Sequence, residues 1–380
     1  MAQYDAIVLG VGGVGSASLF HLAARGARVL GIDRFPPGHD RGSSHGQTRL
    51  IRQAYFEHPN YVPMLLRAFD LWHELEQRAD ETLYHQVGLL QIGPPAGEVV
   101  RGVRASARLH GLPIENLSAR EAEMRFKGFR VPSDCEAIFE QRAGYLMVER
   151  CVIAHAEQAV RLGAQLHTEE TVRGWRVEPT GLVVVETDRA KYAADRLVVS
   201  AGAWSSQLLS DLGVSLEVRR KPLYWWRTRG DTYRADLGCP GFLYDLPQGC
   251  FYGVPQIDPA GVKVAEHTGG AIVDDPLTVN REVDLIDQSR VTDFVGGYLL
   301  DATTHCTDHA VCMYTMTPDA HFIVDVHPQH PQLVFAAGLS GHGFKFTGVL
   351  GETLSQLVLD GRASLPIEFL SVTRTALKRE

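Results

Sequence analysis

The chain has 380 residues, of which 45% are hydrophobic, 22% charged and 8% aromatic, and its formal net charge is −8. This composition excludes a disordered protein, a collagen-like fibre and a small disulfide-stabilised scaffold. The 37 lysines and arginines are fewer than the 45 aspartates and glutamates and form no dense basic block, so the sequence predicts no nucleic-acid binding.

The six cysteines are dispersed along the chain and form no Cys-x-x-Cys pair. This spacing predicts neither a zinc site nor a secreted disulfide framework. No basic region precedes the first apolar run, and no stretch approaches the ~18 consecutive apolar residues of a membrane span. We therefore predict a cytoplasmic protein that contacts no membrane and holds no metal.

The first residues have the pattern of a nucleotide-binding unit. Residues 6–9 form an apolar run typical of a buried parallel strand, and residues 16–25 carry apolar side chains at helical spacing. Residues 27–32 form a second apolar run, which ends at Asp33. A glycine motif with the spacing G-x-G-x-x-G joins the first strand to the helix, through Gly10, Gly12 and Gly15.

Each part of this unit has a predicted role. The first glycine permits a tight turn, the second lets the backbone approach a pyrophosphate, and the third lets the helix pack on the strand. The positive helix N-terminus favours the pyrophosphate. Asp33 is expected to bind a ribose, and Arg34 to contact adenine or phosphate. A tight turn without a ligand is the alternative, and the motif does not distinguish NAD from FAD.

The rest of the chain alternates between helical and strand-like patterns. Apolar periodicity predicts helices over residues 61–79, 118–123, 147–163 and 349–359, and strands over 180–187, 192–200 and 333–337. Residues 214–300 read as strands separated by turn signals. We predict an α/β fold in which a nucleotide-binding domain is built from discontinuous segments. These are residues 1–85, 147–213 and 319–380, and a mixed or antiparallel-sheet substrate domain is inserted as residues 86–146 and 214–318.

Three further segments carry a resemblance to a known family. They are residues 42–52 (GSSHGQTRLIR), 310–315 (AVCMYT) and 338–346 (GLSGHGFKF). Together with the glycine motif they resemble the monomeric sarcosine oxidase and N-methyltryptophan oxidase family, amine oxidases that carry covalently bound FAD. The resemblance extends over nearly the whole chain, with the motifs in the same order and at similar spacing.

The resemblance implies roles for the central residues of the site. Cys312 corresponds to the cysteine that forms a thioether to the flavin. Arg52 and Lys345 correspond to the residues that bind the substrate carboxylate, and Lys263 to the lysine that activates dioxygen. The flavin is flanked by His45 and Arg49, and the substrate cavity is lined by His267, Tyr314 and Tyr252.

The FAD contacts implied in the same way extend beyond the first glycine motif. They are Gly10, Gly12, Gly15, Asp33, Arg34, Ser43, Thr48, Val172, Gly202, Gly338, Gly341 and Gly343. The loop of residues 338–343 precedes a helix, and its amide groups favour the negative charge of a reduced flavin. Two positions depart from the family, which usually has a second histidine and an aspartate where this chain has Ser44 and Gln47.

The implied reaction is the oxidative demethylation of a secondary amino acid such as sarcosine by a monomeric enzyme. Its products are formaldehyde, the primary amino acid and, from dioxygen, hydrogen peroxide. Two alternatives stay open. One is a flavoprotein dehydrogenase of secondary or cyclic amino acids, such as pipecolate, that passes electrons to a quinone or protein carrier. The other is a nicotinamide-dependent dehydrogenase or a nucleotide-binding regulatory protein.

Without the family, the same residues allow simpler interpretations. Cys312 reads as a small buried hydrophobic residue and Lys263 as the exposed side of a strand. A lysine in a glycine-rich loop, such as Lys345, is usually solvated, although the phenylalanines on either side indicate apolar walls. The Trp225-Trp226 pair is typical of sheet packing, and residues 305–309 are typical of a solvated loop rather than a metal site.

Overall fold

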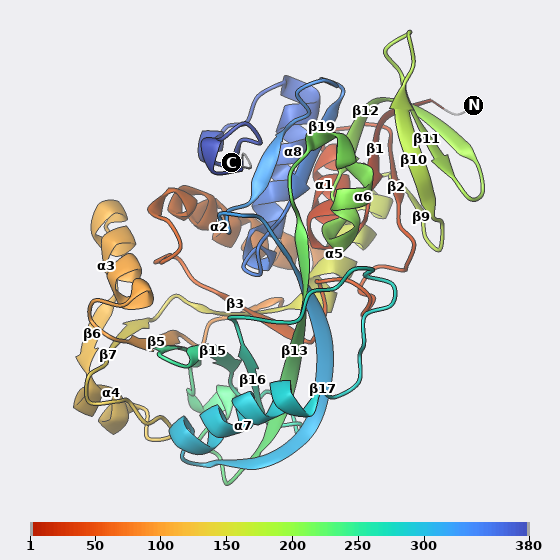
Figure 1. Ribbon diagram of the computed structural model, residues 1–380. Coiled ribbons are helices and arrows are strands. Elements are labelled where there is room, and N and C mark those ends of the chain that lie inside the picture. Colours follow the sequence, from red (N-terminus) through yellow and green to blue (C-terminus); the bar gives the residue numbers. More distant parts are fainter. Residues whose placement is uncertain (1–2, 378–380) are drawn as a thin grey trace.

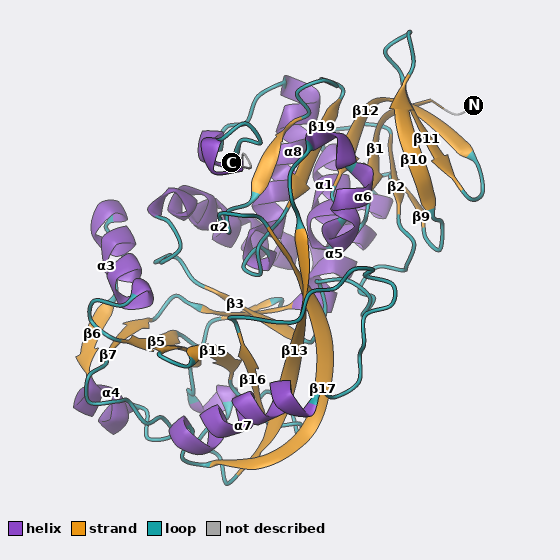
Figure 2. Cartoon of the chain, viewed as in Figure 1, coloured by secondary structure: helices purple, strands orange, loops and turns teal. Residues whose placement is uncertain are grey.

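The computed structural model describes residues 3–377, which contain three β-sheets with helices packed against them (Figure 1). One eight-stranded sheet and its helices form one half of the molecule, and a second eight-stranded sheet forms the other (Figure 2). The third sheet has three strands, β3 (Thr48–Ile51), β8 (Gly144–Met147) and β4 (Tyr84–His85). Within residues 3–377, no helix has both the length and the apolar character needed to span a membrane.

The first sheet has a parallel centre. Residues 6–9 are completely buried, which explains their continuous apolar run, because a central parallel strand is covered on both faces. The strand order is β10 (Val172–Val177), β11 (Val183–Thr187), β12 (Lys191–Val199), β1 (Gln3–Leu9), β2 (Val29–Ile32) and β9 (Gln165–His167). Beside β12 lies β19 (Leu333–Ala337), which in turn pairs with β18 (Ile323–Val326).

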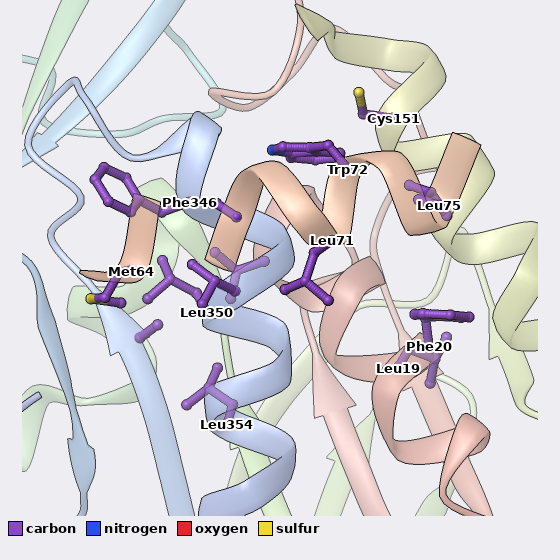
Figure 3. Close-up of a cluster of buried hydrophobic side chains, with 14 of the residues drawn as sticks. Leu19, Phe20, Met64, Leu71, Trp72, Leu75, Cys151, Phe346, Leu350 and Leu354 are labelled. Carbon is purple, nitrogen blue, oxygen red and sulfur yellow. The ribbon is translucent and has the colours of Figure 1, made fainter. Parts of the chain in front are cut away.

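Four helices form the main hydrophobic core with this sheet. They are α1 (Gly13–Ala24), α2 (Val62–Ala79), α5 (Val148–Arg161) and α8 (Thr347–Asp360). Figure 3 shows Leu71 and Trp72 of α2 on the same cluster as Leu350 of α8 and Leu19 of α1. All four side chains are buried, and full burial of an aliphatic side chain contributes about 1.5–3 kcal/mol.

A buried histidine makes this core sensitive to acid. The ring of His155 lies 5.7 Å from that of Phe20 and 5.5 Å from that of Trp72, and burial lowers its pKa to about 3. The pKa of histidine in the unfolded chain is about 6.5, so the unfolded state binds the extra proton and stability falls as pH decreases below that value. His155→Phe should therefore flatten the dependence of unfolding free energy on pH by up to ~1.4 kcal/mol per unit between pH 6 and 4.5. Urea unfolding at several pH values measures this slope, and an unchanged slope would contradict the prediction.

The second sheet is mixed and carries the other wall of the molecule. Its order is β17 (Ala302–Met316), β13 (Glu217–Thr228), β16 (Val262–Glu266), β15 (Gly249–Val254), β14 (Gly241–Leu246), β5 (Leu89–Gly93), β7 (Glu136–Glu140) and β6 (Glu115–Ser118). Only β14 and β5 pair in parallel. The helices in this half are α3 (Glu98–His110), α4 (Ala119–Arg125) and α7 (Leu285–Tyr298) (Figure 1).

The predicted strand character of residues 214–300 is wrong for residues 285–298, which form α7. The side chain of Asp284 caps this helix by accepting hydrogen bonds from the amides of Ile286 and Asp287 at 2.8 and 3.1 Å. The β-branched residues and two glycines of this segment have low helix propensity. Its N-terminal apolar residues are exposed, so the apolar pattern does not follow the buried face of the helix. The helix α3, whose buried face is mainly valine, is also absent from the predicted elements.

The other predicted elements agree with the structure to within three residues at each end. The helices predicted over 61–79, 118–123, 147–163 and 349–359 are α2, α4, α5 and α8, and the strand over 333–337 is β19. The structure thus confirms the α/β class and the mixed second sheet. The residue boundaries of the two domains stay a prediction. A short α6 (Ser205–Leu208) follows β12.

Candidate active site

One elongated pocket runs from the glycine loop after β1 to the start of α8. Both large sheets contribute to its walls, because β14, β15 and β17 of the second sheet and β1, β2 and β19 of the first each supply lining residues. Most of the predicted site residues line it, namely Gly10, Gly12, Asp33, Arg34, Ser43, Arg49, Arg52, Val172, Gly202, Tyr252, His267, Tyr314, Gly338, Gly341, Gly343 and Lys345.

The glycine loop has the close backbone contacts that its sequence predicts. Gly10 has a φ of +82°, and a Cβ at Gly15 would lie 1.7 Å from the carbonyl oxygen of Gly10. Only glycine therefore permits α1 to pack this closely on β1. Gly15 serves packing and does not line the pocket, whereas Gly10 and Gly12 line it just before α1 begins.

Asp33 lies at the end of β2 and fixes the same loop. Its carboxylate accepts hydrogen bonds from the amide of Val11 at 2.6 Å and from the amide of Phe35 at 2.8 Å. Burial raises its pKa, and these amide donors partly offset the effect. Carboxylate oxygens have two lone pairs each, so the residue keeps acceptor capacity toward a ribose.

Several buried polar atoms of the pocket wall have no hydrogen-bond partner. They are Arg34 Nη1, Trp204 Nε1, Thr315 Oγ1 and Thr347 Oγ1, all in residues that line the pocket. Buried donors and acceptors are rarely left unpaired in folded proteins. Together with the glycine backbone at one end, these atoms fit an extended polar ligand of the dinucleotide type.

Cys312 lies beside Arg49. Its sulfur is 3.1 Å from Arg49 Nη2, which donates to it, and 3.3 Å from the carbonyl oxygen of Ser43. A guanidinium at this distance stabilises negative charge on sulfur. His45 precedes Arg49 by four residues and is also buried. Burial, together with the charge of Arg49, lowers the pKa of His45 to about 3. With this pKa the ring is neutral at physiological pH, and its Nε2 atom has no hydrogen-bond partner among the described residues.

Lys263 is held by the loop that precedes β3. Its Nζ donates to the carbonyl oxygens of Gly46 at 2.9 Å and Thr48 at 2.6 Å, and the residue is 2% exposed. The simpler interpretation as the exposed side of a strand is therefore wrong. Burial and the charge of Arg49 lower its pKa well below the usual value.

The two positions that depart from the family have contacts of their own in this loop. The hydroxyl of Ser44 accepts a hydrogen bond from the amide of Gly13 at 3.2 Å. The side-chain amide of Gln47 donates to Asp258 and accepts from Trp225 Nε1 at 3.1 Å. Both residues thus fix the loop that holds Lys263.

Arg52 forms a buried ion pair at the far end of the pocket. Its Nη2 donates to both carboxylate oxygens of Glu57, at 2.6 and 2.8 Å. The guanidinium lies 4.5 Å from the ring centroid of Tyr55 and 4.8 Å from that of Phe56. Burial opposes ionisation of Glu57, but the charges of Arg52, His342 and Lys345 together outweigh it and lower the pKa of Glu57 to about 2. Arg52 Nε is buried and has no partner, so one donor stays available.

Lys345 lies at the same end and has no carboxylate partner. Its Nζ donates to the carbonyl oxygen of His342 at 2.6 Å and to the hydroxyl of Tyr55 at 3.3 Å. The residue is 4% exposed, which rules out a solvated loop lysine. Burial and the neighbouring Arg52 lower its pKa well below the usual value. Arg52 and Lys345 therefore bring two basic groups to one end of the pocket, and an anion bound there would favour the charged form of the lysine.

Tyr252, His267 and Tyr314 form the wall from the second sheet. His267 Nδ1 lies 3.4 Å from the hydroxyl oxygen of Tyr314. Burial, followed by the charge of Lys221, lowers the pKa of His267 to about 3, so this ring is neutral at physiological pH. Burial likewise raises the pKa of both tyrosines, which keeps their hydroxyl groups protonated.

Five predicted residues lie behind the pocket wall, namely Gly15, His45, Thr48, Lys263 and Cys312. Trp225 and Trp226 also pack within the sheet, as the simpler interpretation predicts, and do not line the pocket. The interpretation of residues 305–309 as a loop is wrong, because they lie on the first half of strand β17, although that half is partly exposed to solvent.

Among residues 3–377, Asp211, His327 and His330 bring three possible metal-ligand atoms within 4.8 Å of one another. However, the amide of Gln329 donates to His327 Nδ1 at 3.2 Å. This bond leaves the ring proton on Nε2, the atom that faces Asp211 at 3.1 Å and that a metal would need.

Four of the residues at the pocket that sequence reasoning missed bear on its chemistry. Glu57, Phe56 and Trp204 line it, and Lys221 lies behind Tyr314 and His267. Lys221 alternates with Leu223 and Trp225 along β13, so its period-two spacing places it on a buried face and was the available signal. Glu57 had no comparable signal, because an acid five residues after an arginine is common in loops.

The chain is similar to known proteins along most of its length. The family described as FAD dependent oxidoreductase (DAO) matches residues 5–357. The chain is 40% identical to a monomeric sarcosine oxidase from Bacillus sp. (strain B-0618), covering 99% of this chain and 97% of that protein. It is 32% identical to an N-methyl-L-tryptophan oxidase from Yersinia pestis (strain Pestoides F), covering 98% and 99%.

A solved structure of NikD, an unusual amino acid oxidase essential for nikkomycin biosynthesis, superposes with a TM-score of 0.85. It is 25% identical and covers 98% of each chain. The glycine loop, Asp33 and the unpaired polar atoms of the pocket are consistent with the cofactor of these proteins. From its full-length match and this architecture, the chain belongs to the DAO family of FAD dependent oxidoreductases.

Proposed function

We propose that this enzyme catalyses the oxidative demethylation of a secondary N-methyl amino acid such as sarcosine. The observation that carries the proposal is the pair of buried cations, Arg52 and Lys345, at the end of a dinucleotide-type pocket. The names of the relatives, monomeric sarcosine oxidase and N-methyl-L-tryptophan oxidase, support the same substrate class.

Bound FAD would accept a hydride equivalent from the N-methyl carbon and pass the two electrons to dioxygen. Sarcosine, water and dioxygen then give glycine, formaldehyde and hydrogen peroxide. The residues around the glycine loop would hold the dinucleotide, and Cys312 would attach the flavin covalently through a thioether. The 3.1 Å contact supports this attachment, because the guanidinium of Arg49 holds the sulfur in place beside the pocket.

The substrate carboxylate would bind between Arg52 and Lys345. Glu57 occupies Arg52 Nη2, so the carboxylate would bind through the unpaired Nε of Arg52 or replace Glu57, and through Lys345 Nζ. Two fixed cations orient the amine and its methyl group, and this positioning lowers the entropic part of the barrier. The same positive field disfavours a protonated amine, which must be neutral to be oxidised.

The wall opposite these cations would orient the amine. His267 is neutral, and its contact with the Tyr314 hydroxyl places a polar group that can hold the proton of the amine. On the far side of the flavin, Lys263 would stabilise the negative charge that develops on dioxygen. This buried cation favours an oxidase over a dehydrogenase that uses another electron acceptor. We further propose that the enzyme is a monomer located in the cytoplasm.

Acid precipitation of the purified protein, followed by a peroxide assay, tests the proposed function. We expect yellow colour to stay with the pellet and N-methyl amino acids to give equimolar peroxide and formaldehyde. Yellow colour in the supernatant would refute covalent attachment of the flavin but not the proposed reaction. Substrate-reduced flavin that air does not reoxidise would instead support the dehydrogenase alternative. A colourless protein that takes up no FAD would refute the proposal.

Removing the charge of Lys345 should weaken substrate binding. A charge-assisted hydrogen bond contributes about 1.5–3 kcal/mol, so Lys345→Met is expected to raise KM for sarcosine by roughly 10- to 100-fold. Steady-state peroxide formation measures the change. Lys191→Met is the matched control, because Lys191 is exposed on β12 and pairs only with Glu186, and it should leave KM unchanged. An unchanged KM in Lys345→Met would contradict carboxylate binding at this residue.

A further inference from the structure

Lys221 is a buried lysine next to the substrate wall that the proposed reaction does not use. It lies on β13 directly opposite Cys312 of β17, and its side chain is 2% exposed. Trp225, four residues further along β13, pairs in the same way with Lys263 of β16. Lys221 therefore shares the face of the sheet that carries Lys263 and Cys312.

The ammonium group of Lys221 contacts two parts of this wall. Its Nζ donates to the carbonyl oxygens of Thr268 at 2.7 Å and Gly269 at 3.2 Å, the two residues after His267. It also lies 5.2 Å from the ring centroid of Tyr314, within the range of a cation–π interaction. One charged group thus contacts both the turn that follows His267 and the aromatic side chain that His267 faces.

Among residues 3–377, no carboxylate forms an ion pair with Lys221. The acids whose charge acts on Lys221 are Glu266 and Asp287, and each is paired with an arginine, at 2.5 Å to Arg290 and 2.6 Å to Arg220. Burial lowers the pKa of Lys221 to about 8, so the group is mainly protonated at pH 7. An unpaired ammonium costs free energy to bury, and a neutral residue would pack here at lower cost. Packing alone therefore does not account for a lysine at this position.

The turn after His267 depends on this contact for its attachment to β13. Beyond Gly269, the backbone returns to the strand, where the amide of Arg220 donates to Ala271 and the amide of Val273 donates to Val218, both at 2.8 Å. Between His267 and Ala271, the lysine supplies the side-chain donors to the turn. The amide of His267 donates to the carbonyl of Cys250 at 2.7 Å, so loss of the lysine contact would loosen the turn beyond His267 and the orientation of its ring toward Tyr314.

We propose that Lys221 is a positioning residue of the substrate cavity, which ties the turn after His267 to the ring of Tyr314. It thereby fixes the wall formed by Tyr252, His267 and Tyr314. The expected effect of Lys221 on turnover assumes the proposed function. Lys221 touches neither substrate nor flavin in this assignment. Its loss should impair substrate positioning and leave the reaction with dioxygen at Lys263 intact.

The first test is hydrogen exchange of the FAD-loaded enzyme, which needs no substrate. Lys221→Met keeps an unbranched apolar stem and removes the donors. We expect amides in residues 267–273 to exchange at least tenfold faster, with no such change in the helices around α1. Arg219→Met is the matched control, because Arg219 is on the same strand but pairs with Glu217 and is partly exposed. Unchanged exchange, or a uniform increase over the whole chain, would overturn the proposal.

The second test separates this proposal from the proposed function. In anaerobic stopped-flow reduction by sarcosine, Lys221→Met should raise the apparent Kd about tenfold, and reoxidation by air should change less than twofold. If no N-methyl amino acid reduces the wild-type flavin, the proposed function fails, while the exchange experiment still decides the role of Lys221. If Lys221→Met does not fold, Lys221→Leu, which also removes the donors, is measured in the same way. Wild-type exchange together with wild-type Kd in that variant would overturn the proposal.

Discussion

Cys312→Ser should release the flavin from the protein on acid precipitation. Serine keeps the size of the side chain but removes the sulfur that we propose as the point of attachment. The yellow colour is expected to move from the pellet to the supernatant, a nearly complete change that an absorbance spectrum of the two fractions measures. Peroxide formation should fall with it, because Arg49 loses its sulfur partner at 3.1 Å.

Cys306→Ser is the control for this experiment. Cys306 is on the same strand β17 but is partly exposed, and its sulfur contacts the carbonyl of Asp308 rather than the pocket. This variant should keep its flavin in the pellet. If Cys312→Ser also kept covalent flavin, the attachment site would have to be another residue. If both variants lost it, the loss would reflect disturbed folding of β17.

Lys263→Met should slow the reoxidation of the reduced enzyme by dioxygen about 100-fold or more. Loss of one preorganised charge-stabilising donor in an active site costs roughly 10²- to 10³-fold. Reduction by substrate should change far less, because the substrate carboxylate would bind at Arg52 and Lys345. Stopped-flow measurements of the two half-reactions test this difference. Equal slowing of both half-reactions would contradict the assignment to dioxygen.

The substitution also removes two hydrogen bonds to the loop before β3, from Lys263 Nζ to the carbonyls of Gly46 and Thr48. Covalent flavin content and the midpoint of urea unfolding therefore have to be measured in parallel. Lys127→Met removes an exposed lysine and should leave both half-reactions unchanged. Slow reoxidation with full flavin content would separate the chemical role of Lys263 from its structural one.

Local sequence determined the glycine loop and most of the helices. Gly10 is required by its positive φ, and Gly15 by its close contact with the backbone of Gly10. Both constraints act within a few residues, so a short sequence motif can reveal them. The apolar periodicity of α2 likewise reflects which side of one helix is buried. Where local propensity and burial conflicted, as in the exposed, glycine-containing α7, the prediction from sequence was wrong.

The arrangement of charges in the pocket was decided by the tertiary structure. Lys263 is buried because its strand packs against the loop before β3, where its Nζ contacts the carbonyls of Gly46 and Thr48, and the sequence of β16 alone does not indicate this contact. The Glu57 partner of Arg52 and the contact of Arg49 with Cys312 depend on how separate segments approach each other. A sequence pattern specifies which residues share a face of a strand or helix. The partner of a buried charge is set by the packing of distant elements. This pairing matters for stability because a buried charge loses its hydration and needs a partner to offset that cost.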